Sequence, residues 1–236
     1  MATFALHAIP VLEPRPSLAI VGENARFPVR RAFCIGRNYA AHAREMGHDP
    51  DREPPFFFMK TAEAIVPVEA GTPGEIAYPS QTGDYHHEAE LVVALAKGGR
   101  DIPEAEAMKH VFGLAAGLDM TRRDLQGEAK KLGRPWEIGK SADQSGPVGP
   151  LTRYSAGTSL AGGLKLLVGG KIRQDSPLAA MIWSIPEQIA ILSRFFELKP
   201  GDLIFTGTPE GVAAIARGET MRVEIDGVTP IEVKVV

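Results

Sequence analysis

The chain has 236 residues and a formal net charge of -3, and 44% of its residues are hydrophobic. These values are ordinary for a globular protein and leave no basic surface that would indicate nucleic-acid binding. The single cysteine, Cys34, excludes an intramolecular disulfide and a cysteine-based zinc site. Prolines and charged residues interrupt residues 1–20, and no apolar run is long enough for a membrane span. We therefore expect a cytoplasmic protein with no membrane partner.

The first half of the chain predicts mostly strands. Residues 1–30 are punctuated by prolines and predict short strands or an N-terminal arm. Asn38 is placed to cap a short helix that runs through Met46, and a proline-rich loop follows at 48–55. Further strands are expected at 31–35, 56–59, 64–68, 76–78, 85–96 and 111–120. Helices are expected from Pro103 to about His110 and from Thr121, which would cap the second helix, to Leu132.

The second half carries a hairpin signal, because Gly169-Gly170 separates strand-like runs at 164–168 and 171–174. Residues 185–196 have apolar positions at helical spacing and a proline in the first turn. Further strands are expected at 203–205, 220–225 and 230–236. Strands outnumber helices and do not alternate regularly with them, which favours a β-rich α+β fold. Without an internal repeat or linker, we expect one domain over 31–236, preceded by the short segment 1–30.

Three acidic residues lie at apolar strands. Glu88 and Glu90 are two residues apart at the start of an apolar run, so both point to one face of a strand, and Asp119 ends a second apolar run. Buried carboxylates need a cationic partner, and three that converge favour a hard divalent cation such as Mg2+. A solvated strand face and a zinc site that includes His86 are alternatives. His86 suits a hydrogen-bonded supporting role better.

His42 and Glu45 are three residues apart on the expected helix, and therefore lie on one face. Such a pair can act as a general-base dyad, in which Glu45 orients the imidazole and His42 takes a proton from water. The neighbouring proline-rich loop would suit a lid that carries these residues. An ordinary surface ion pair is the alternative.

Four other polar residues are candidates for the same site. We interpret Lys140 as a buried cation near the carboxylates, because the glycine spacing before it does not match a phosphate-binding loop. Arg123 and Gln126 share a helix face, and Thr208 lies in a glycine-containing loop after an apolar strand. The alternatives are a surface lysine, a solvated helix face and an ordinary turn. A covalent nucleophile is disfavoured, because the chain has no Gly-x-Ser-x-Gly elbow.

Several motifs, taken in order, resemble the fumarylacetoacetate hydrolase family. They lie at residues 34–46, 55–60, 86–91, 117–126, 135–141 and 205–211. The resemblance runs from about residue 31 to the C-terminus. Within the family, the Pro-Pro-Phe-Phe-Phe stretch and the Asp-Met-Thr-Arg-Arg-Asp run are most similar to bacterial fumarylpyruvate hydrolases of the gentisate pathway, followed closely by acylpyruvases.

The resemblance implies a mixed β-roll or sandwich, a homodimer and a bound Mg2+ or Mn2+ ion. The metal ligands of the family match Glu88, Glu90 and Asp119. Its lid dyad matches His42 and Glu45. Its substrate-contacting positions match Lys140, Gln126, Arg123 and Thr208.

The implied reaction is metal-dependent hydrolysis of a C–C bond in a 2,4-dioxo acid, with fumarylpyruvate, which yields fumarate and pyruvate, as the expected substrate. Lys140 would stabilise the pyruvate enolate, and Arg37 or Arg123 would hold the distal carboxylate. A broader acylpyruvase activity, oxaloacetate decarboxylation, keto–enol isomerisation and a non-catalytic metal-binding role are alternatives that stay open. The His42–Glu45 pair favours hydrolysis, because decarboxylation and isomerisation need no activated water.

Overall fold

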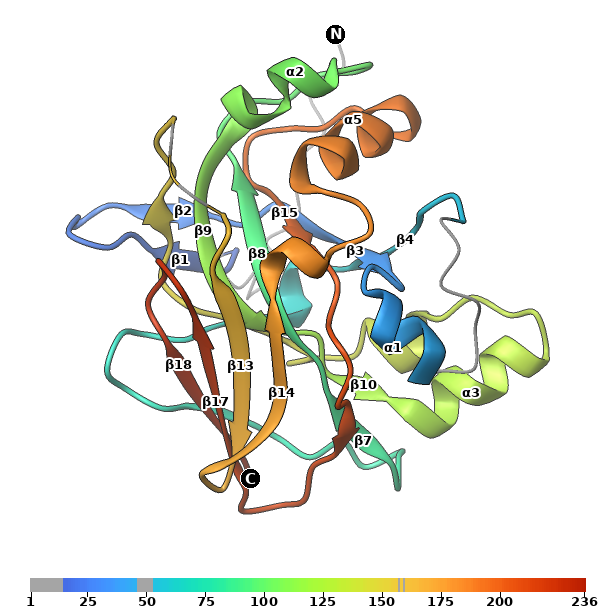
Figure 1. Cartoon of the computed structure of the whole chain (residues 1–236). Helices are drawn as coiled ribbons and strands as arrows, with labels where there is room; N and C mark the ends of the chain where they lie inside the picture. Colours follow the sequence, from blue (N-terminus) through green and yellow to red (C-terminus); the bar gives the residue numbers. More distant parts are fainter. Residues whose placement is uncertain (1–14, 46–52, 157, 159) are drawn as a thin grey trace, which may run out of the picture.

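The computed structural model describes residues 15–45, 53–156, 158 and 160–236. The expectations for residues 1–14, for Met46 and for most of the loop at 48–55 lie outside this part of the chain. Within it, an eight-stranded sheet and a five-stranded sheet form the body of the molecule, and short helices lie at their margins (Figure 1). The predicted β-rich α+β fold is confirmed. No helix among the described residues is long and apolar enough to cross a membrane.

The eight-stranded sheet holds a long antiparallel pair, β8 and β9, at its centre. Its order is β4-β3-β15-β8-β9-β11-β5, and β12 also pairs with β9. Every residue of β8 is buried, as expected for a strand that is covered on both faces. The strands are β3 (Arg31–Gly36), β4 (Phe56–Lys60), β5 (Ile65–Pro67), β8 (Ala89–Leu95), β9 (Val111–Leu118), β11 (Gly146–Val148), β12 (Thr152–Arg153) and β15 (Asp202–Phe205).

The five-stranded sheet has the order β14-β13-β17-β18-β6. The predicted hairpin is present, and both glycines of the Gly169-Gly170 turn have positive φ. Strand β17 alternates buried and half-buried residues, so one face of this sheet packs on the core. The strands are β6 (Gly74–Ile76), β13 (Gly163–Val168), β14 (Lys171–Pro177), β17 (Thr220–Ile225) and β18 (Ile231–Val235).

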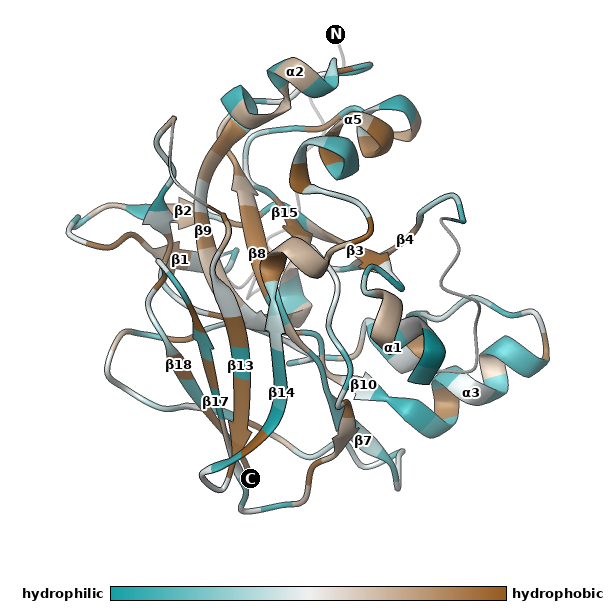
Figure 2. Ribbon diagram, viewed as in Figure 1, coloured by the Kyte–Doolittle hydropathy of each residue, from teal (hydrophilic) through white to brown (hydrophobic). Residues whose placement is uncertain are grey.

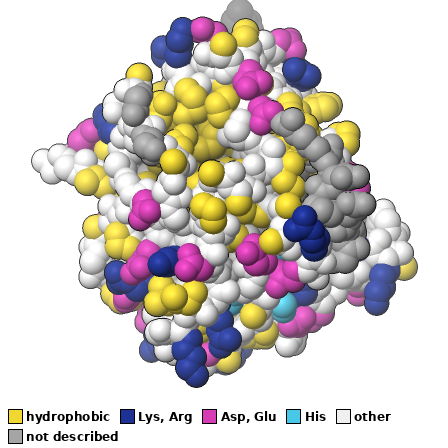
Figure 3. All heavy atoms as spheres, in the orientation of Figure 1, with side chains coloured by type: hydrophobic (Ala, Val, Ile, Leu, Met, Phe, Trp, Pro, Cys, Tyr) yellow, Lys and Arg dark blue, Asp and Glu magenta, His cyan; other side chains and the backbone are white. Residues whose placement is uncertain are grey.

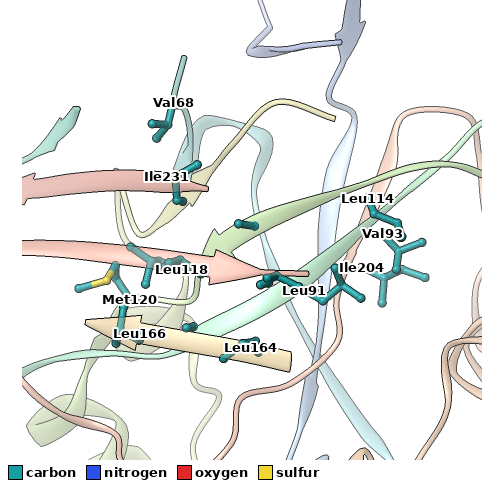
Figure 4. Packing of buried hydrophobic residues seen from close by; sticks show 14 of the residues in the cluster. Val68, Leu91, Val93, Leu114, Leu118, Met120, Leu164, Leu166, Ile204 and Ile231 are labelled. Carbon is teal, nitrogen blue, oxygen red and sulfur yellow. The ribbon is translucent and has the colours of Figure 1, made fainter. Parts of the chain in front are cut away.

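The main core lies between these two sheets. Strands β13 and β17 pack against β8 and β9, which brings Leu91 and Leu118 close to Leu164 and Leu166 (Figure 4). Hydrophobic residues are concentrated along β8 and β9 (Figure 2). Each fully buried aliphatic side chain contributes roughly 1.5–3 kcal/mol of transfer free energy. The packed sheets therefore form a rigid support for side chains at their ends.

A second apolar cluster covers the other face of the eight-stranded sheet. Leu18 and Phe27 of the hairpin β1 (Ser17–Ala19) and β2 (Arg26–Pro28) pack there with Val92 and Ala94 of β8. The short strands expected before residue 31 are thus present among residues 15–30. They explain why both faces of β8 are apolar.

A small third sheet corrects the predicted strand at 85–96. The chain breaks at Glu88 into β7 (Tyr85–His87) and β8, and β7 pairs instead with β10 (Thr121–Arg122) and β16 (Ala213–Ala214). The β8–β9 ladder ends at the Ala89–Leu118 pair, and the β7–β10 ladder begins at His86–Thr121. Glu88 and Asp119 therefore both lie in the gap between two ladders.

The helices are short, and two predicted caps are wrong. The Asn38 amide instead bonds the backbone of Trp183 and Thr206, and the Thr121 hydroxyl donates to the Asp119 carbonyl. In both cases a partner outside the helix satisfies the side chain. The helices are α1 (Ala40–Glu45), α2 (Glu104–Ala107), which continues as η2 (Met108–His110), α3 (Arg123–Lys131), α4 (Glu137–Lys140) and α5 (Ile185–Phe195), with the 3-10 turns η1 (Ala62–Ala64) and η3 (Leu178–Ala180).

Candidate active site

Three carboxylates converge at the gap between the β7–β10 and β8–β9 ladders. One oxygen each from Glu88, Glu90 and Asp119 lies within 4.8 Å of the others. The three residues are only 5%, 1% and 1% exposed. The predicted convergence is therefore confirmed, although Glu88 lies at a strand break and not inside one continuous strand.

Cations neutralise two of the three carboxylates. Lys140 Nζ donates to Glu88 at 2.8 Å and to Asp119 at 2.7 Å, and Arg123 also binds Glu88. Burial by itself would raise the pKa of Glu88, but the charges of Lys140 and Arg123 together hold that pKa well below its usual range. Lys140 is thus the buried cation that its sequence context predicts, and it lies at the end of α4.

Glu90 has no such cation beside it among the described residues, and accepts a hydrogen bond of 2.7 Å from the Gly207 N–H. Burial, followed by the charges of Asp119 and Glu88, raises the pKa of Glu90 well above its usual range. Within the described chain, Asp119 Oδ1 also accepts no aligned hydrogen bond, although Lys60 Nζ is 2.9 Å away. Three buried carboxylates that converge, with Glu90 in no ion pair in the described structure, fit a hard divalent cation, so these residues could hold Mg2+ or Mn2+.

Lys60 is a site residue for which the sequence predicted no role. Its side chain is fully buried at the end of β4, where Nζ lies 2.9 Å from both Asp119 Oδ1 and Ser145 Oγ and also contacts the Lys140 carbonyl. Its signal in the sequence is a lysine directly after an apolar strand, 56–59. A buried lysine there needs an anion, and Asp119 supplies it.

The predicted dyad is assembled on α1. His42 Nδ1 lies 3.2 Å from Glu45 Oε2, and His42 is 6% exposed. The Gly211 N–H donates to both oxygens of Glu45 at 3.1 Å. Because Glu45 engages Nδ1, the other ring nitrogen, Nε2, is left to take a proton. A buried, supported histidine beside a pocket differs from the surface ion pair that was the alternative.

One loop connects the dyad to the carboxylates. Residues 206–211 supply the Gly207 N–H to Glu90 and the Gly211 N–H to Glu45. Between them, the Thr208 hydroxyl donates to the Ala89 carbonyl. Gln174 of β14, which the sequence did not indicate, donates to Thr208 and to the Pro209 carbonyl, both at 2.8 Å. The five-stranded sheet thus positions this loop through one buried amide.

An open pocket lies over the carboxylates. Glu45 and Asp119, the two predicted site residues that do not line it, support its wall from behind. Lys130 and the aromatic rings are additions to the predicted set. The lining side chains are those of Arg37, His42, Glu88, Glu90, Arg123, Gln126, Lys130, Lys140, Thr208, Phe56, Phe58 and Trp136, with Ile35 and Gly36.

His86 has the supporting position that was favoured for it. Its Nε2 lies 2.7 Å from Asp84 Oδ1, and Arg123 Nε lies 3.5 Å from its Nδ1. Arg123 also donates to the Gln126 side chain at 2.7 Å. Among the described residues, the group of side chains that could hold a metal does not include His86. The alternative zinc site is not formed.

Comparison with known proteins agrees with this arrangement. A sequence model described as the C-terminal part of fumarylacetoacetate (FAA) hydrolase matches residues 31–236. The chain belongs to the fumarylacetoacetate hydrolase family. Over 192 residues it is 40% identical to a fumarylpyruvate hydrolase of Ralstonia sp., covering 80% of this chain and 98% of that protein. Over 209 residues it is 41% identical to a mitochondrial oxaloacetate tautomerase of Rattus norvegicus, covering 87% and 91%.

A solved structure is still more similar. The fumarylpyruvate hydrolase of Pseudomonas aeruginosa, crystallised with Mn2+ and pyruvate, is 57% identical and superposes with a TM-score of 0.95 over 98% of this chain and 99% of that one. The predicted fold type of the family is therefore confirmed. Relatives with two different activities match at nearly equal identity, so family membership alone does not select the reaction.

Substitution of Gly211 tests the loop that supports the dyad. Gly211 has φ +92°, and a Cβ there would lie 2.0 Å from the Arg173 carbonyl oxygen. We expect Gly211→Ala to displace the N–H of residue 211 from Glu45 and to lower the kcat of the enzyme by about tenfold, the effect of losing one charge-assisted hydrogen bond, with metal affinity unchanged. Gly227→Ala is the matched control, because its φ is +84° and nothing lies near its Cβ. Equal kcat values in the two variants would contradict the supporting role.

Proposed function

We propose that this protein is a divalent-metal-dependent hydrolase that cleaves fumarylpyruvate into fumarate and pyruvate. The observation that carries the proposal is the His42–Glu45 pair, held at the wall of a pocket that opens over three buried carboxylates. A general base for water beside a metal site is what hydrolysis of a 2,4-dioxo acid requires. The 57% identity to a fumarylpyruvate hydrolase crystallised with Mn2+ and pyruvate supports this choice of substrate.

In the proposed mechanism Glu88, Glu90 and Asp119 would hold Mg2+ or Mn2+. When bound, the cation would supply a Lewis acid for the oxygens of a 2-oxo acid. The C1 carboxylate of the substrate would bind beside Arg123, whose guanidinium is already oriented by Glu88 and Gln126. This assignment leaves the distal carboxylate to other cations.

Water is the second reactant. His42 Nε2 would take a proton from it, and the resulting imidazolium is stabilised by Glu45. The water oxygen attacks the C4 carbonyl, the C3–C4 bond breaks, and its electron pair forms the enolate of pyruvate. Lys140 is placed to stabilise that negative charge. Transfer of a proton to C3 then gives pyruvate, while C4 leaves as the new carboxylate of fumarate.

Oxaloacetate tautomerisation is the second candidate function, because the rat tautomerase is 41% identical to this chain, against 40% for the Ralstonia hydrolase. A spectrophotometric screen separates the two. Fumarylpyruvate, acetylpyruvate and oxaloacetate would be compared with and without Mg2+, and pyruvate would be measured separately. We expect pyruvate from fumarylpyruvate at a kcat/KM well above the other rates. Rapid tautomerisation of oxaloacetate with no cleavage of either acylpyruvate would favour the tautomerase.

The expected homodimer, the cytoplasmic location and a role in gentisate breakdown stay predictions. An apolar depression between α5 and the sheets is compatible with association, because exposed apolar patches often mark interaction sites. Hydrophobic side chains gather in the upper middle of the face shown in Figure 3. The depression is lined by Leu91, Leu160, Leu178, Met181, Ile185 and Pro186.

A further inference from the structure

Two cations at the pocket are left over once the buried carboxylates are neutralised. Lys60, Lys140 and Arg123 bind the carboxylates directly. Arg37 and Lys130 also line the pocket, but neither forms an ion pair with these carboxylates in the described structure. A concentration of positive charge that is not neutralised by close ion pairs indicates a site for an anionic ligand.

The interactions that these two cations make with neighbouring side chains are weak. Arg37 lies 3.6 Å from Glu53, whose side chain is 62% exposed, and such exposed pairs contribute little. Among the described residues, Lys130 has no carboxylate partner; its ammonium lies 5.0 Å from the centre of the Trp136 ring. Both cations could therefore bind a ligand carboxylate without first breaking a strong ion pair.

Aromatic contacts bring Arg37 and Lys130 to one part of the pocket. The Arg37 guanidinium lies 5.4 Å from the centre of the Phe56 ring, and Phe56 meets Trp136 edge to face with a centroid separation of 5.2 Å. Arg37 also has φ +57°, a left-handed conformation that costs a non-glycine residue energy and is often found at functional sites. The backbone thus holds Arg37 at the pocket at some energetic cost.

The charge of Lys130 is also destabilised. Burial, followed by the charges of Arg123 and Arg37 and, more weakly, Lys140, lowers the pKa of Lys130 to about 8, and only the charge of Glu88 acts in the opposite direction. An anion placed between these cations would relieve the repulsion. In the absence of one, Lys130 loses its proton nearer to neutral pH than an ordinary lysine does.

We propose that Arg37 and Lys130 form a subsite for a second carboxylate and make the enzyme selective for dicarboxylic 2,4-dioxo acids. Arg37 contacts Phe56 and Lys130 contacts Trp136 in this subsite. The inference rests on the proposed function, in which Arg123 takes the first carboxylate. The two rings would pack against the flat unsaturated chain between the carboxylates. A substrate that ends in a methyl group would leave both cations unpaired.

Substrate comparison with single variants tests the subsite. Lys130→Met and Arg37→Met keep an aliphatic side chain and remove the charge. Each should lower kcat/KM for fumarylpyruvate by about 10- to 100-fold, mainly through KM, which corresponds to one lost charged contact. The fall for acetylpyruvate should be less than about threefold. Lys131→Met, at the exposed neighbouring position on α3, is the matched control and should change neither value.

The pH dependence gives a second readout. The relevant ratio is kcat/KM for fumarylpyruvate divided by kcat/KM for acetylpyruvate, in which effects on the shared chemistry cancel. Lys130 is charged below its pKa, so the ratio should be high below about pH 8 and fall above it. In Lys130→Arg the ratio should stay high through this range, because arginine remains charged.

Two results would overturn the subsite. One is an equal loss on both substrates in Lys130→Met and Arg37→Met, which would show a merely structural role. The other is unchanged binding of fumarate, measured by calorimetry, in both variants. Because fumarate binding needs no turnover, it tests the subsite even if the wild-type protein cleaves neither acylpyruvate. In that case the proposed function fails, while at least tenfold weaker fumarate binding in the variants would still support the subsite.

Discussion

Chelation of divalent metal with EDTA should abolish fumarylpyruvate cleavage, and added Mg2+ or Mn2+ should restore it. Glu88, Glu90 and Asp119 form an all-oxygen ligand set that suits these cations. Glu90 in particular is buried beside two other carboxylates with no cation of its own in the described structure, so an added divalent charge would stabilise it strongly. Full activity in metal-free buffer would contradict the metal assignment.

Glu88→Gln should remove most metal binding, by at least 10- to 100-fold in affinity, with a corresponding loss of activity. Glutamine is preferable to alanine here, because it keeps the volume beside Lys140 and Arg123, which both bind Glu88. Truncation would leave these cations facing a void and destabilise the fold as well. Glu137→Gln, at an exposed position on α4, is the control and should bind metal normally. Circular dichroism would show that both variants are folded.

His42→Ala should lower kcat for fumarylpyruvate cleavage by about 100-fold or more, the usual contribution of a positioned general base. Glu45 and the loop at Gly211 hold the imidazole at the pocket wall, so the structure supplies the orientation that this role needs. Tautomerisation or decarboxylation of oxaloacetate should fall much less, because neither needs an activated water.

The control for this substitution is His110→Ala, because the His110 side chain lies outside the pocket, with its Nδ1 3.4 Å from the Lys97 carbonyl oxygen. It should leave both reactions unchanged. Equal losses in the two reactions for His42→Ala would show that His42 does something other than activate water.

The sequence predicted the long elements well because their signals are local. The apolar runs of β3, β4 and β9 and the Gly169-Gly170 hairpin can be recognised without knowing what they pack against. The strand break at Glu88 could not be recognised from the sequence, since it depends on the pairing of β7 with two distant segments, β10 and β16. The predicted helix cap at Asn38 is wrong because the real partners of its side chain, Trp183 and Thr206, are 145 and 168 residues away in the sequence.

For the candidate site too, local patterns in the sequence could be recognised, whereas contacts between distant elements could not. The motifs indicated the acidic residues and the dyad, because both are short patterns along the chain. Gln174 and Lys130 were missed, since each acts through partners on other elements and neither belongs to a recognisable pattern. The structure also shows that the two arginines predicted to bind substrate have different surroundings: Arg123 is bound to Glu88 and Gln126, whereas Arg37 lies at the aromatic part of the pocket. One domain over residues 31–236 stays a prediction.

Attack of water on C4 can be tested directly by following fumarylpyruvate cleavage in water labelled with oxygen-18 and analysing the products by mass spectrometry. If water attacks C4, each turnover should yield equal amounts of pyruvate and fumarate, with one labelled oxygen in the fumarate. Product formation should require a divalent metal and should fall in His42→Ala. Consumption of fumarylpyruvate without fumarate, or fumarate that lacks the label, would contradict the proposed hydrolysis.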